Sequence, residues 1–478
     1  MTGFVGRKRE LQVLNGLTQK RSASMVVIKG RRRIGKSRLI QEFGKGFKTK
    51  YFFSGVPPTS ETTKQSQIDE FARQMCVHLS LPEMRFMDWG DLFSFLGKQV
   101  QNGKVLIVFD EISWIGSKDF DFLGKIKNLW DMHFNQNDKL IFIMCGSISA
   151  WIERNILKST GFVGRISATM TLAELSLSEC AQFFDPPGKR LSAFEKFKLL
   201  SVTGGVPKYL EEIRPELTAE QNIRNLCFTT EGYLFDEFDK IFSDVFLTRS
   251  DFYKKAVELL VNRPSSPKEI CDEIGVTLNS TASDYFDELE QAGIVKRDYA
   301  WHLKTQTASK LSHFRLKDNY SRFYLKYIRP NKNKIQNGLF EDKSLVGLPG
   351  WNAIMGLQFE NLVLNNRKKI WELLNIPPEE IVWENPFFQN KTSKHPGCQI
   401  DYLIQTKYSN LYVCEIKFSS TEVKIDIIPE VERKMKLLQR PKGFSCRPVL
   451  IHVNGVHEDV EDQQYFSKII DFGNLLSD

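Results

Sequence analysis

Residues 30–37 read GRRRIGKS, with the residue types and spacing of a loop that binds a phosphate chain. Glycines let backbone N–H groups curl around an anion, and a helix that follows adds positive potential at its first turn. Lys36 is expected to reach the β- and γ-phosphates, and the Ser37 hydroxyl to bind Mg²⁺. The predicted nucleotide-binding residues of this segment are Gly30, Arg31, Arg32, Arg33, Ile34, Gly35, Lys36, Ser37 and Arg38.

The segment VLIVFDE, residues 105–111, should place two carboxylates beside that loop. A buried strand puts Asp110 at its carboxyl end, where it can hold the Mg²⁺ shell. Glu111 then stands where a carboxylate can polarise an attacking water. A strand that ends in Asp-Glu is also compatible with an ordinary helix cap. Downstream of a phosphate-binding loop, the pair favours a site that binds and hydrolyses ATP.

A third set of chemical residues lies near the C-terminus. Asp401 falls in the β-prone run QIDYLI, and Glu415 and Lys417 fall in the next run, LYVCEIK. Alternation along a strand puts Glu415 and Lys417 on one face and turns Ile416 into the core. Asp401 and Glu415 could then share Mg²⁺ or Mn²⁺, with Lys417 positioning the water.

The first 170 residues or so alternate β-rich runs with helical patterns, which predicts a parallel α/β sheet. The expected strands are SMVVIKG, KYFFSG, VLIVFDE and KLIFIMCGS. From about Leu177 to Ser243 only helical patterns continue, as in a helical lid. Residues 252–298 then have the spacing of a helix-turn-helix, and residues 299–316 are β-prone, as a wing would be.

Composition sets broader limits. The 478 residues suggest roughly three or four domains. No apolar run reaches the ~20 residues of a membrane span, and MTGFVGRKRE lacks a signal-peptide stretch, so we expect a cytoplasmic protein without membrane contact. The eight cysteines form no CxxC pair and should be buried free thiols. A net charge of +8 is compatible with DNA but does not establish it.

The N-terminal half resembles the archaeal-type P-loop ATPases of the AAA+/STAND assemblage. The residues that carry the resemblance are FVGRKREL, GRRRIGKSRL, VLIVFDEISW, IMCGSISAWI, GFVGR and GGVPKYL, in that order. The resemblance implies that Val5 and Arg7 lie near the adenine and that Ser147 senses the γ-phosphate. It also implies a lid contact through Gly205 and Pro207.

In that family, an arginine after the fourth strand acts within its own chain or on a neighbouring subunit, and Arg165 is the candidate. Arg154 and Arg190 are alternatives. A homo-oligomer would follow from the trans arrangement. Arg7 could instead simply pair with Glu10 at a helix start, and Ser147 could be a turn residue.

The C-terminal pattern resembles a PD-(D/E)XK restriction-endonuclease-like domain, which members of the ATPase family often carry. The resemblance adds Glu360, in the helical run GLQFENLV, as a further acidic residue. It implies a metal-dependent DNA nuclease, or a copy kept for DNA binding or docking. The expected domains are an ATPase core at 1–175, a helical lid at 176–248, a winged helix at 249–328, a linker at 329–350 and the nuclease-like domain at 351–478.

The middle segment gives weaker grounds for DNA contact. The expected reading helix, near residues 279–292, exposes no Arg or Lys, so base recognition is not evident. Lys296, Arg297 and Lys304 around the wing could contact phosphate. A structural spacer explains the segment nearly as well.

These observations favour an ATPase that couples its nucleotide state to DNA binding or processing. A STAND-like regulatory switch with an inactive nuclease-like domain is the main alternative. A defence nuclease that uses ATP only for regulation is a third, and no protein partner is indicated.

Overall fold

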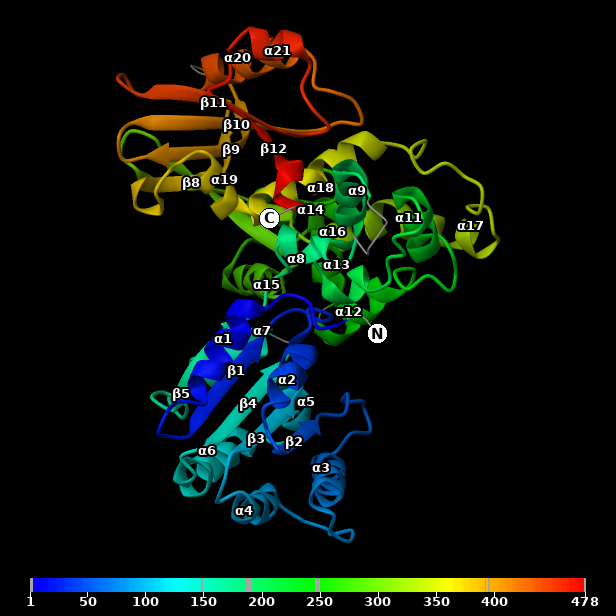
Figure 1. Cartoon of the computed structure of the whole chain (residues 1–478), viewed down its shortest axis with the longest axis vertical. Helices are drawn as coiled ribbons and strands as arrows, with labels where there is room; N and C mark the ends of the chain where they lie inside the picture. The colour runs from blue at the N-terminus through cyan, green and yellow to red at the C-terminus, as the bar shows by residue number, and fades with distance from the viewer. Residues whose placement is uncertain are drawn as a thin grey trace. The chain divides into compact units, whose positions relative to one another are not determined.

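The computed structural model describes residues 3–147, 149–184, 191–245, 250–391, 393 and 396–476. The chain forms two compact units, residues 1–174 and 175–478. Each unit has its own sheet and core, and Figure 1 shows their elements.

Unit 1 is a parallel α/β domain. Its strands have the order β2-β3-β4-β1-β5, and every neighbouring pair is parallel. Its main elements are α1 (Lys8–Leu17), β1 (Ser24–Lys29), α2 (Lys36–Gly44), β2 (Thr49–Ser54), α3 (Lys64–Leu79), α4 (Trp89–Gln99), β3 (Val105–Asp110), α5 (Ile112–Ile115), α6 (Phe122–Met132), β4 (Leu140–Gly146), α7 (Ser149–Ile152), a π-helical turn (Glu153–Leu157) and β5 (Ile166–Thr171).

The two faces of this sheet bury alternate residues of the same strands. Val27, Ile107 and Phe142 belong to one apolar cluster, together with residues of α3, α4 and α6. Val26 and Val108 belong to the other, with residues of α1 and α2. This period of two makes the strands apolar on both faces, which is the signature of a parallel sheet covered by helices.

The four strands predicted from the sequence are present as β1 to β4, and the α/β class is confirmed. The prediction missed the fifth strand, β5. Its sequence, ISATMT, has no continuous apolar run, because β5 lies at the edge of the sheet and only Met170 among its residues is fully buried.

Unit 2 begins with helices and ends in a mixed sheet. The helices up to residue 291 are α8 (Leu177–Ala181), α9 (Ala193–Thr203), α10 (Pro207–Leu210), α11 (Ala219–Cys227), α12 (Glu237–Val245), α13 (Ser250–Leu259), α14 (Pro267–Ile274) and α15 (Ser280–Gln291). The antiparallel hairpin β6 (Val295–His302) and β7 (Thr307–Leu316) follows. This succession has the element order of a helix-turn-helix with a wing.

The remaining elements form the C-terminal α/β part. They are α16 (Asn319–Phe323), a π-helical turn (Tyr324–Ile328), α17 (Lys332–Gln336), α18 (Trp351–Asn365), α19 (Arg367–Leu373), β8 (Ile381–Gln389), β9 (Cys398–Thr406), β10 (Asn410–Phe418), α20 (Ile427–Leu437), β11 (Ser445–Val453), α21 (Glu458–Asp462) and β12 (Lys468–Asp471). The sheet order is β12-β11-β10-β9-β8, in which β8, β9 and β10 pair antiparallel and β10, β11 and β12 pair parallel.

The segment 329–350, expected as a linker, packs into unit 2. Phe340, Leu345 and Leu348 are buried, and the Phe340 ring stacks on Phe228 with centroids 5.0 Å apart. Its Asn, Gly and Pro content makes turns, but its apolar residues anchor it to the helices.

The cysteines are free thiols, as predicted. Seven are buried, and only Cys446 is partly exposed. Their burial in apolar cores explains their scattered spacing in the sequence.

Candidate functional site

The loop between β1 and α2 has a backbone that requires glycine at two positions. Gly30 has φ +155°, and a Cβ there would lie 2.7 Å from the carbonyl oxygen of Leu172. Gly35, which precedes α2, has φ +92°. Both conformations are costly for a residue with a side chain. The two glycines of the motif therefore shape a loop that leads directly into the first turn of α2.

Lys36 lies inside this loop. Its Nζ donates hydrogen bonds to the carbonyl oxygens of Gly30, at 2.9 Å, and Arg31, at 3.1 Å. The residue is only 6% exposed, and this burial lowers the pKa of its ammonium, although the nearby Glu111 carboxylate opposes the shift. The cation is thus held at the centre of the loop.

Ser37 and Asp110 meet across the end of the sheet. The Ser37 Oγ donates to Asp110 Oδ2 at 2.7 Å. The other carboxylate oxygen, Oδ1, accepts from the Cys145 thiol at 2.9 Å and from the Glu111 N–H at 3.0 Å. These contacts fix the Asp110 carboxylate with one oxygen toward Ser37, and they assemble the hydroxyl and carboxylate ligands that Mg²⁺ prefers.

Glu111 is oriented by Ser147. The Glu111 Oε2 accepts from the Ser147 N–H at 3.0 Å and from its Oγ at 2.9 Å. Glu111 itself has φ +51°, a left-handed conformation uncommon for a residue with a side chain. The sequence predicted Ser147 as a γ-phosphate sensor, and the structure gives it a direct contact with the proposed catalytic carboxylate.

Arg7 ties the N-terminal segment to the loop. Its Nη2 donates to the carbonyl oxygens of Ile34, at 3.1 Å, and Ala173, at 2.6 Å. The ion pair with Glu10, which was the alternative interpretation, is also present at 3.2 Å. Arg7 therefore joins the start of the chain, the phosphate loop and the segment after β5.

The other predicted nucleotide residues of unit 1 divide between core and surface. Ile34 is fully buried, whereas Arg38 is exposed and Val5, Arg32 and Arg33 are partly exposed. Arg31 lies 3.7 Å from the Glu174 carboxylate. The burial of Ile34 anchors the loop, and Arg31 is held by an ion pair beside it.

Arg165 lies at the opposite edge of the sheet from the loop. It directly precedes β5, which runs parallel to β1 from Met25↔Ile166 onward, so it is at the amino edge, while Gly30 follows β1 at the carboxyl edge. A six-residue strand separates the two edges by about 20 Å. The Arg165 guanidinium makes a two-pronged contact with Asp131, at 2.7 and 2.8 Å.

Arg165 therefore does not reach the phosphate loop of its own chain. Of the alternatives, Arg154 is in the π-helical turn, and Arg190 lies outside the described residues. Gly205 and Pro207, predicted at a lid contact, belong to unit 2, where Pro207 opens α10.

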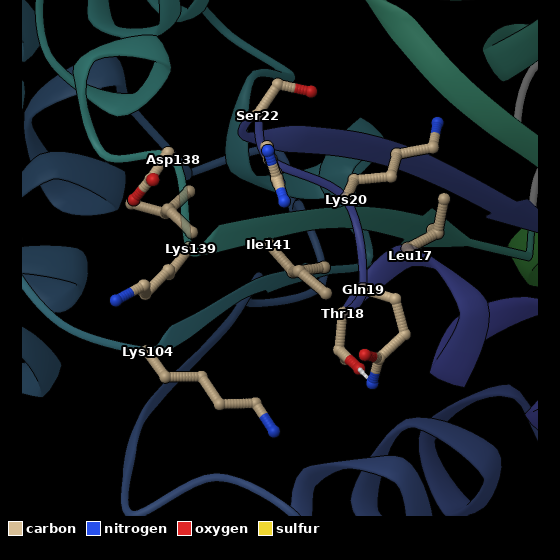
Figure 2. A pocket seen from close by; sticks show the side chains of 11 residues that line it. Leu17, Thr18, Gln19, Lys20, Ser22, Lys104, Asp138, Lys139 and Ile141 are labelled. Carbon is tan, nitrogen blue, oxygen red and sulfur yellow. Dashed lines mark hydrogen bonds between the residues drawn. The ribbon is translucent and has the colours of Figure 1, made fainter.

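The amino edge also carries a hollow of about 220 Å³. Figure 2 shows Lys20, Lys104 and Lys139 around it, together with Asp138. Its lining comes from the end of α1 and the segment before β1, from Lys104 before β3, and from residues before and at the start of β4, so it lies at the far end of the sheet from Gly30. This hollow is separate from the phosphate loop.

A second constellation forms on the β9–β10 hairpin of unit 2. Cys414 pairs with Tyr402, so Asp401 and Glu415 occupy the next step of the ladder. The Ile416 N–H donates to Asp401 Oδ2 at 3.0 Å, and Lys417 Nζ lies 3.0 Å from Glu415 Oε1. Ile416 is buried. The predicted alternation is therefore confirmed, and the structure brings Asp401, Glu415 and Lys417 together.

Sequence reasoning missed Lys434 of α20. Its Nζ donates to both oxygens of Glu415, at 2.8 and 2.6 Å, and lies 3.6 Å from Asp401 Oδ1. Glu430, one turn earlier, accepts from Lys417 at 3.0 and 3.1 Å. The run EVERKMK reads as a solvated helix face, so only the fold reveals this contact.

Glu360, in α18, adds a third carboxyl near Asp401 and Glu415. Its low-dielectric surroundings and the Asp401 carboxylate raise the pKa of Glu360 to about 8, while Arg322 opposes the shift. Burial and Asp401 also raise the pKa of Glu415. The helical carboxyl predicted from the sequence is thus close enough to both carboxylates to interact with them.

The β6–β7 hairpin, which the sequence predicted to be a wing, is docked on the C-terminal sheet. The Trp301 ring stacks on Trp383 at 5.9 Å, and its Nε1 donates to Gln405 Oε1 at 2.6 Å. Lys296 pairs with Glu290 at 2.6 Å. Arg297 lies 4.9 Å from the centre of the Tyr299 ring. Two of the three predicted phosphate-contacting residues thus have partners within the protein, which favours the spacer interpretation for this part of the wing.

Among the described residues, no helix combines the length and apolar character needed to cross a membrane.

Comparisons with known proteins find a family match in the N-terminal part. A family model for ATPase domains found predominantly in Archaea matches residues 4–213. An uncharacterised protein of Methanocaldococcus jannaschii is 23% identical over 364 residues, which are 75% of this chain and 76% of that protein.

Two solved structures align with this chain at low sequence identity. The Walker-type ATPase of Pyrococcus abyssi aligns with a TM-score of 0.47 and 15% identity, over 67% of this chain and 96% of that chain. The ORC2 protein of Aeropyrum pernix, in complexes with ADPNP and ADP, aligns with a TM-score of 0.39 and 13% identity, over 71% of this chain and 97% of that chain.

The matched range contains the whole constellation of unit 1. Lys36, Ser37, Asp110, Glu111 and Ser147 all lie within it and converge at the carboxyl edge of the parallel sheet. Residues 4–213 of this chain therefore match the model of an ATPase domain found predominantly in Archaea, and the parallel α/β sheet of unit 1 lies within that range.

Proposed function

We propose that the ATPase domain binds ATP with Mg²⁺ and hydrolyses it. The observation that carries the proposal is the 2.7 Å contact of Ser37 with Asp110, beside a buried lysine and a carboxylate held by Ser147. A phosphate-binding loop that had lost turnover would have no need of Glu111 in a fixed orientation. The set of residues matches hydrolysis better than binding alone.

Each side chain has a separate task in this proposal. Lys36 and the N–H groups of the loop hold the phosphates, and Ser37 with Asp110 would hold the metal. Mg²⁺, when bound, supplies neutralisation of the charge on the β- and γ-phosphates. Glu111 orients and polarises the attacking water, and Ser147 keeps its carboxylate in place.

Four variants test this assignment. Lys36→Ala is expected to abolish ATP binding, measured with a fluorescent ATP analogue. Glu111→Gln should keep binding and lower single-turnover hydrolysis by about 10²–10⁴-fold. Ser147→Ala should lower hydrolysis by roughly tenfold, since one hydrogen bond to Glu111 is lost. Gln41→Ala, at an exposed position of the same helix, is the control. Unchanged ATP binding in Lys36→Ala would refute the site.

The location of Arg165 adds a homo-oligomer to the proposal. Because Arg165 is about 20 Å from the loop of its own chain, any contribution to phosphate must come from a second copy. Lys36→Ala and Arg165→Ala chains, each inactive alone, should regain part of the activity when mixed. In a mixed assembly, the intact loop of an Arg165→Ala chain can receive the intact Arg165 of a Lys36→Ala chain. No recovery on mixing would exclude this role for Arg165.

We also propose that the C-terminal domain engages DNA under control of the nucleotide state. The convergence of Glu360, Asp401, Glu415 and Lys417 supports a nuclease-like domain. A hollow of about 680 Å³ between the wing and the sheet adds support, since Lys304, Arg440 and Phe388 are among the residues that line it. Cationic and aromatic side chains are the usual means of holding nucleic-acid backbone and bases.

The DNA proposal is tested by binding at several salt concentrations. The double variant Lys304→Glu, Arg440→Glu should bind DNA more weakly. The slope of log affinity against log salt concentration should also become shallower, by the amount expected for about two lost phosphate contacts. Lys369→Glu, an exposed change on α19, is the control. Hydrolysis strongly stimulated by DNA would favour DNA processing. Cleavage lost in Glu415→Ala but kept in Lys36→Ala would favour a defence nuclease.

One contact favours the second candidate, a STAND-like switch with an inactive nuclease-like domain. A divalent metal would take Asp401 and Glu415 as its ligands, yet the Lys434 ammonium lies between these two carboxylates. The residues as arranged do not fit a metal, so we derive no cleavage step at this site. Slow ATP hydrolysis without cleavage or binding of any nucleic acid would support the switch.

A further inference from the structure

Lys434 makes the densest set of polar contacts in the C-terminal constellation. Its Nζ lies 2.6 and 2.8 Å from the two Glu415 oxygens, 3.6 Å from Asp401 Oδ1 and 3.8 Å from Glu430 Oε1. The side chain is only 17% exposed. Its ammonium is therefore surrounded by carboxylate oxygens at the place where the hairpin and α20 meet.

Glu415 needs a cation at this position. Its side chain is 1% exposed, and a buried carboxylate without a counter-charge is strongly unfavourable. Lys434 donates to both oxygens of Glu415, and Lys417 contacts Glu415 Oε1 at 3.0 Å. Glu430 in turn holds Lys417 through both oxygens. The charges thus form a closed alternating chain.

A divalent cation would compete for the same lone pairs. Mg²⁺ binds carboxylate oxygens at about 2.0–2.1 Å and demands near-octahedral geometry. Lys434 Nζ contacts both Glu415 oxygens and lies 3.6 Å from Asp401 Oδ1, while Asp401 Oδ2 accepts from the Ile416 N–H. An ammonium and a dication cannot share that space, because their repulsion in a poorly solvated site is large. Within the described ranges, no group of three or more His, Cys, Asp or Glu is arranged to hold a metal.

We propose that Lys434 is the resident cation of the Asp401–Glu415 pair, in place of a divalent metal. Wild-type protein then binds neither Mg²⁺ nor Mn²⁺ at this pair, and removal of the ammonium converts the pair into a divalent-cation site. This inference deepens the second candidate function, and it is independent of ATP hydrolysis by the other unit.

The test compares Mn²⁺ binding by the full-length chain and its Lys434→Met variant, without nucleotide, by isothermal titration and electron paramagnetic resonance. Methionine keeps the length of the side chain and removes the charge. We expect Lys434→Met to bind Mn²⁺ at least tenfold more tightly than wild type at one additional site. The bound metal should also recover melting temperature lost in the variant. Manganese held by Ser37 and Asp110 would be common to both proteins.

Lys434→Arg keeps the charge and should behave as wild type. Lys436→Met, on the same helix but 71% exposed and paired with Glu432, is the matched surface control. Lys434→Gln replaces Lys434→Met if the latter does not fold. Adding Glu415→Gln to Lys434→Met should remove the new site.

Two results would overturn the inference. The first is Mn²⁺ binding by wild type that Glu415→Gln abolishes. The second is an unchanged Mn²⁺ affinity in folded Lys434→Met and in folded Lys434→Gln. ATP binding and hydrolysis, measured on the same preparations, report separately on the ATPase proposal, so failure of one is not failure of the other.

Discussion

The pKa of Glu360 is set by the groups around its carboxyl. It projects from α18 toward Asp401 and Glu415, and poor solvation with the Asp401 charge raises its pKa to about 8. At neutral pH it is mainly protonated and carries little charge. The constellation then has carboxylates only at Asp401, Glu415 and Glu430, against the ammonium groups of Lys417 and Lys434.

This shift predicts a pH dependence of stability. The ordinary pKa is 4.5, so between about 4.5 and 8 the folded protein keeps a proton that the unfolded chain loses. Stability should therefore fall as pH rises through this window, by up to ~1.4 kcal/mol per pH unit. Glu360→Gln should flatten the curve of unfolding free energy against pH. Glu372→Gln, on exposed α19, should leave the curve unchanged, and an equally steep curve in both variants would contradict the assignment.

Lys434 also marks a limit of sequence reasoning at the scale of single residues. Spacing along β10 was enough to place Glu415 and Lys417 on one face, because adjacent strand residues alternate. Nothing in the spacing of α20 relates it to β9, because that contact depends on how a helix crosses a sheet. The position of Arg165, in contrast, follows from the strand order. Because β5 is parallel to β1, a residue that directly precedes β5 must lie at the amino edge of the sheet, away from the phosphate loop.

At the scale of elements, α4 begins with a residue that has two functions. Asp88 caps the helix by accepting from the Gly90 N–H at 2.6 Å, and it pairs with Lys125 at 2.7 Å and Lys64 at 3.4 Å. The bond from Lys125 is the largest cause that lowers the pKa of Asp88 to about 2. The helix start is therefore joined to α6 and α3 by charge.

Two substitutions separate these functions. Asp88→Ala loses the cap and both ion pairs, and should destabilise unit 1 by about 1–2 kcal/mol. Asp88→Asn keeps a good cap and should cost less, because the ion pairs are partly exposed to solvent. In wild type the ionic part is present above pH 3.8 and is lost as pH falls through about 2. The cost of each variant relative to wild type should therefore shrink by the same amount in acid, and Asp88→Ala should keep the cost of the lost cap. Urea unfolding at pH 7 and pH 3 checks this, and equal costs for both at pH 7 would contradict it.

The β6–β7 hairpin, predicted from the sequence as a wing, packs against the C-terminal sheet through one of its tryptophans. Trp301 is buried against Trp383 and Phe387, and its indole N–H bonds to the fully buried Gln405. Trp301→Ala should destabilise unit 2 by about 3–5 kcal/mol. Trp301→Phe keeps the ring packing, loses the bond to Gln405 and should cost about 1–3 kcal/mol. Tyr299→Ala, on the 41% exposed neighbour, is the control; an equal effect of all three would show that the wing is not docked.

The elements that the sequence predicted are those with a strong periodic signal. β1, β3 and β4 are buried along nearly their whole length and read as apolar runs, and β2, at the other edge of the sheet, has the aromatic run Tyr51–Phe53. The edge strand β5 was missed because its Ser and Thr residues interrupt the apolar pattern and only Met170 is buried. The segment 329–350 has the composition of a linker, yet a few large apolar residues such as Phe340 suffice to pack it, and their neighbours in space are far away in sequence.

At the scale of the whole molecule, two cores predict two unfolding events. A ligand that binds one folded unit stabilises that unit by an amount that grows with the logarithm of its concentration. Saturating Mg²⁺-ATP, at about 100 times its dissociation constant, should stabilise unit 1 by about 2.7 kcal/mol. Differential scanning calorimetry of Glu111→Gln, which keeps the nucleotide intact, should show one transition raised by ATP and lowered by Asp88→Ala. The other transition should be lowered by Trp301→Ala. A single transition that responds to ATP, Asp88→Ala and Trp301→Ala alike would contradict separate cores.

The distribution of thiols gives the protein an internal reporter of that unfolding. Seven cysteines are shielded by packing, and Cys145 is also bonded to Asp110, while burial and that carboxylate hold the pKa of its thiol far above its usual range. A maleimide reagent should modify the native chain at Cys446 alone, and each core that opens should expose its own cysteines. Cys145 lies beneath the phosphate loop, so its protection from alkylation would measure how tightly the nucleotide edge of the sheet is closed.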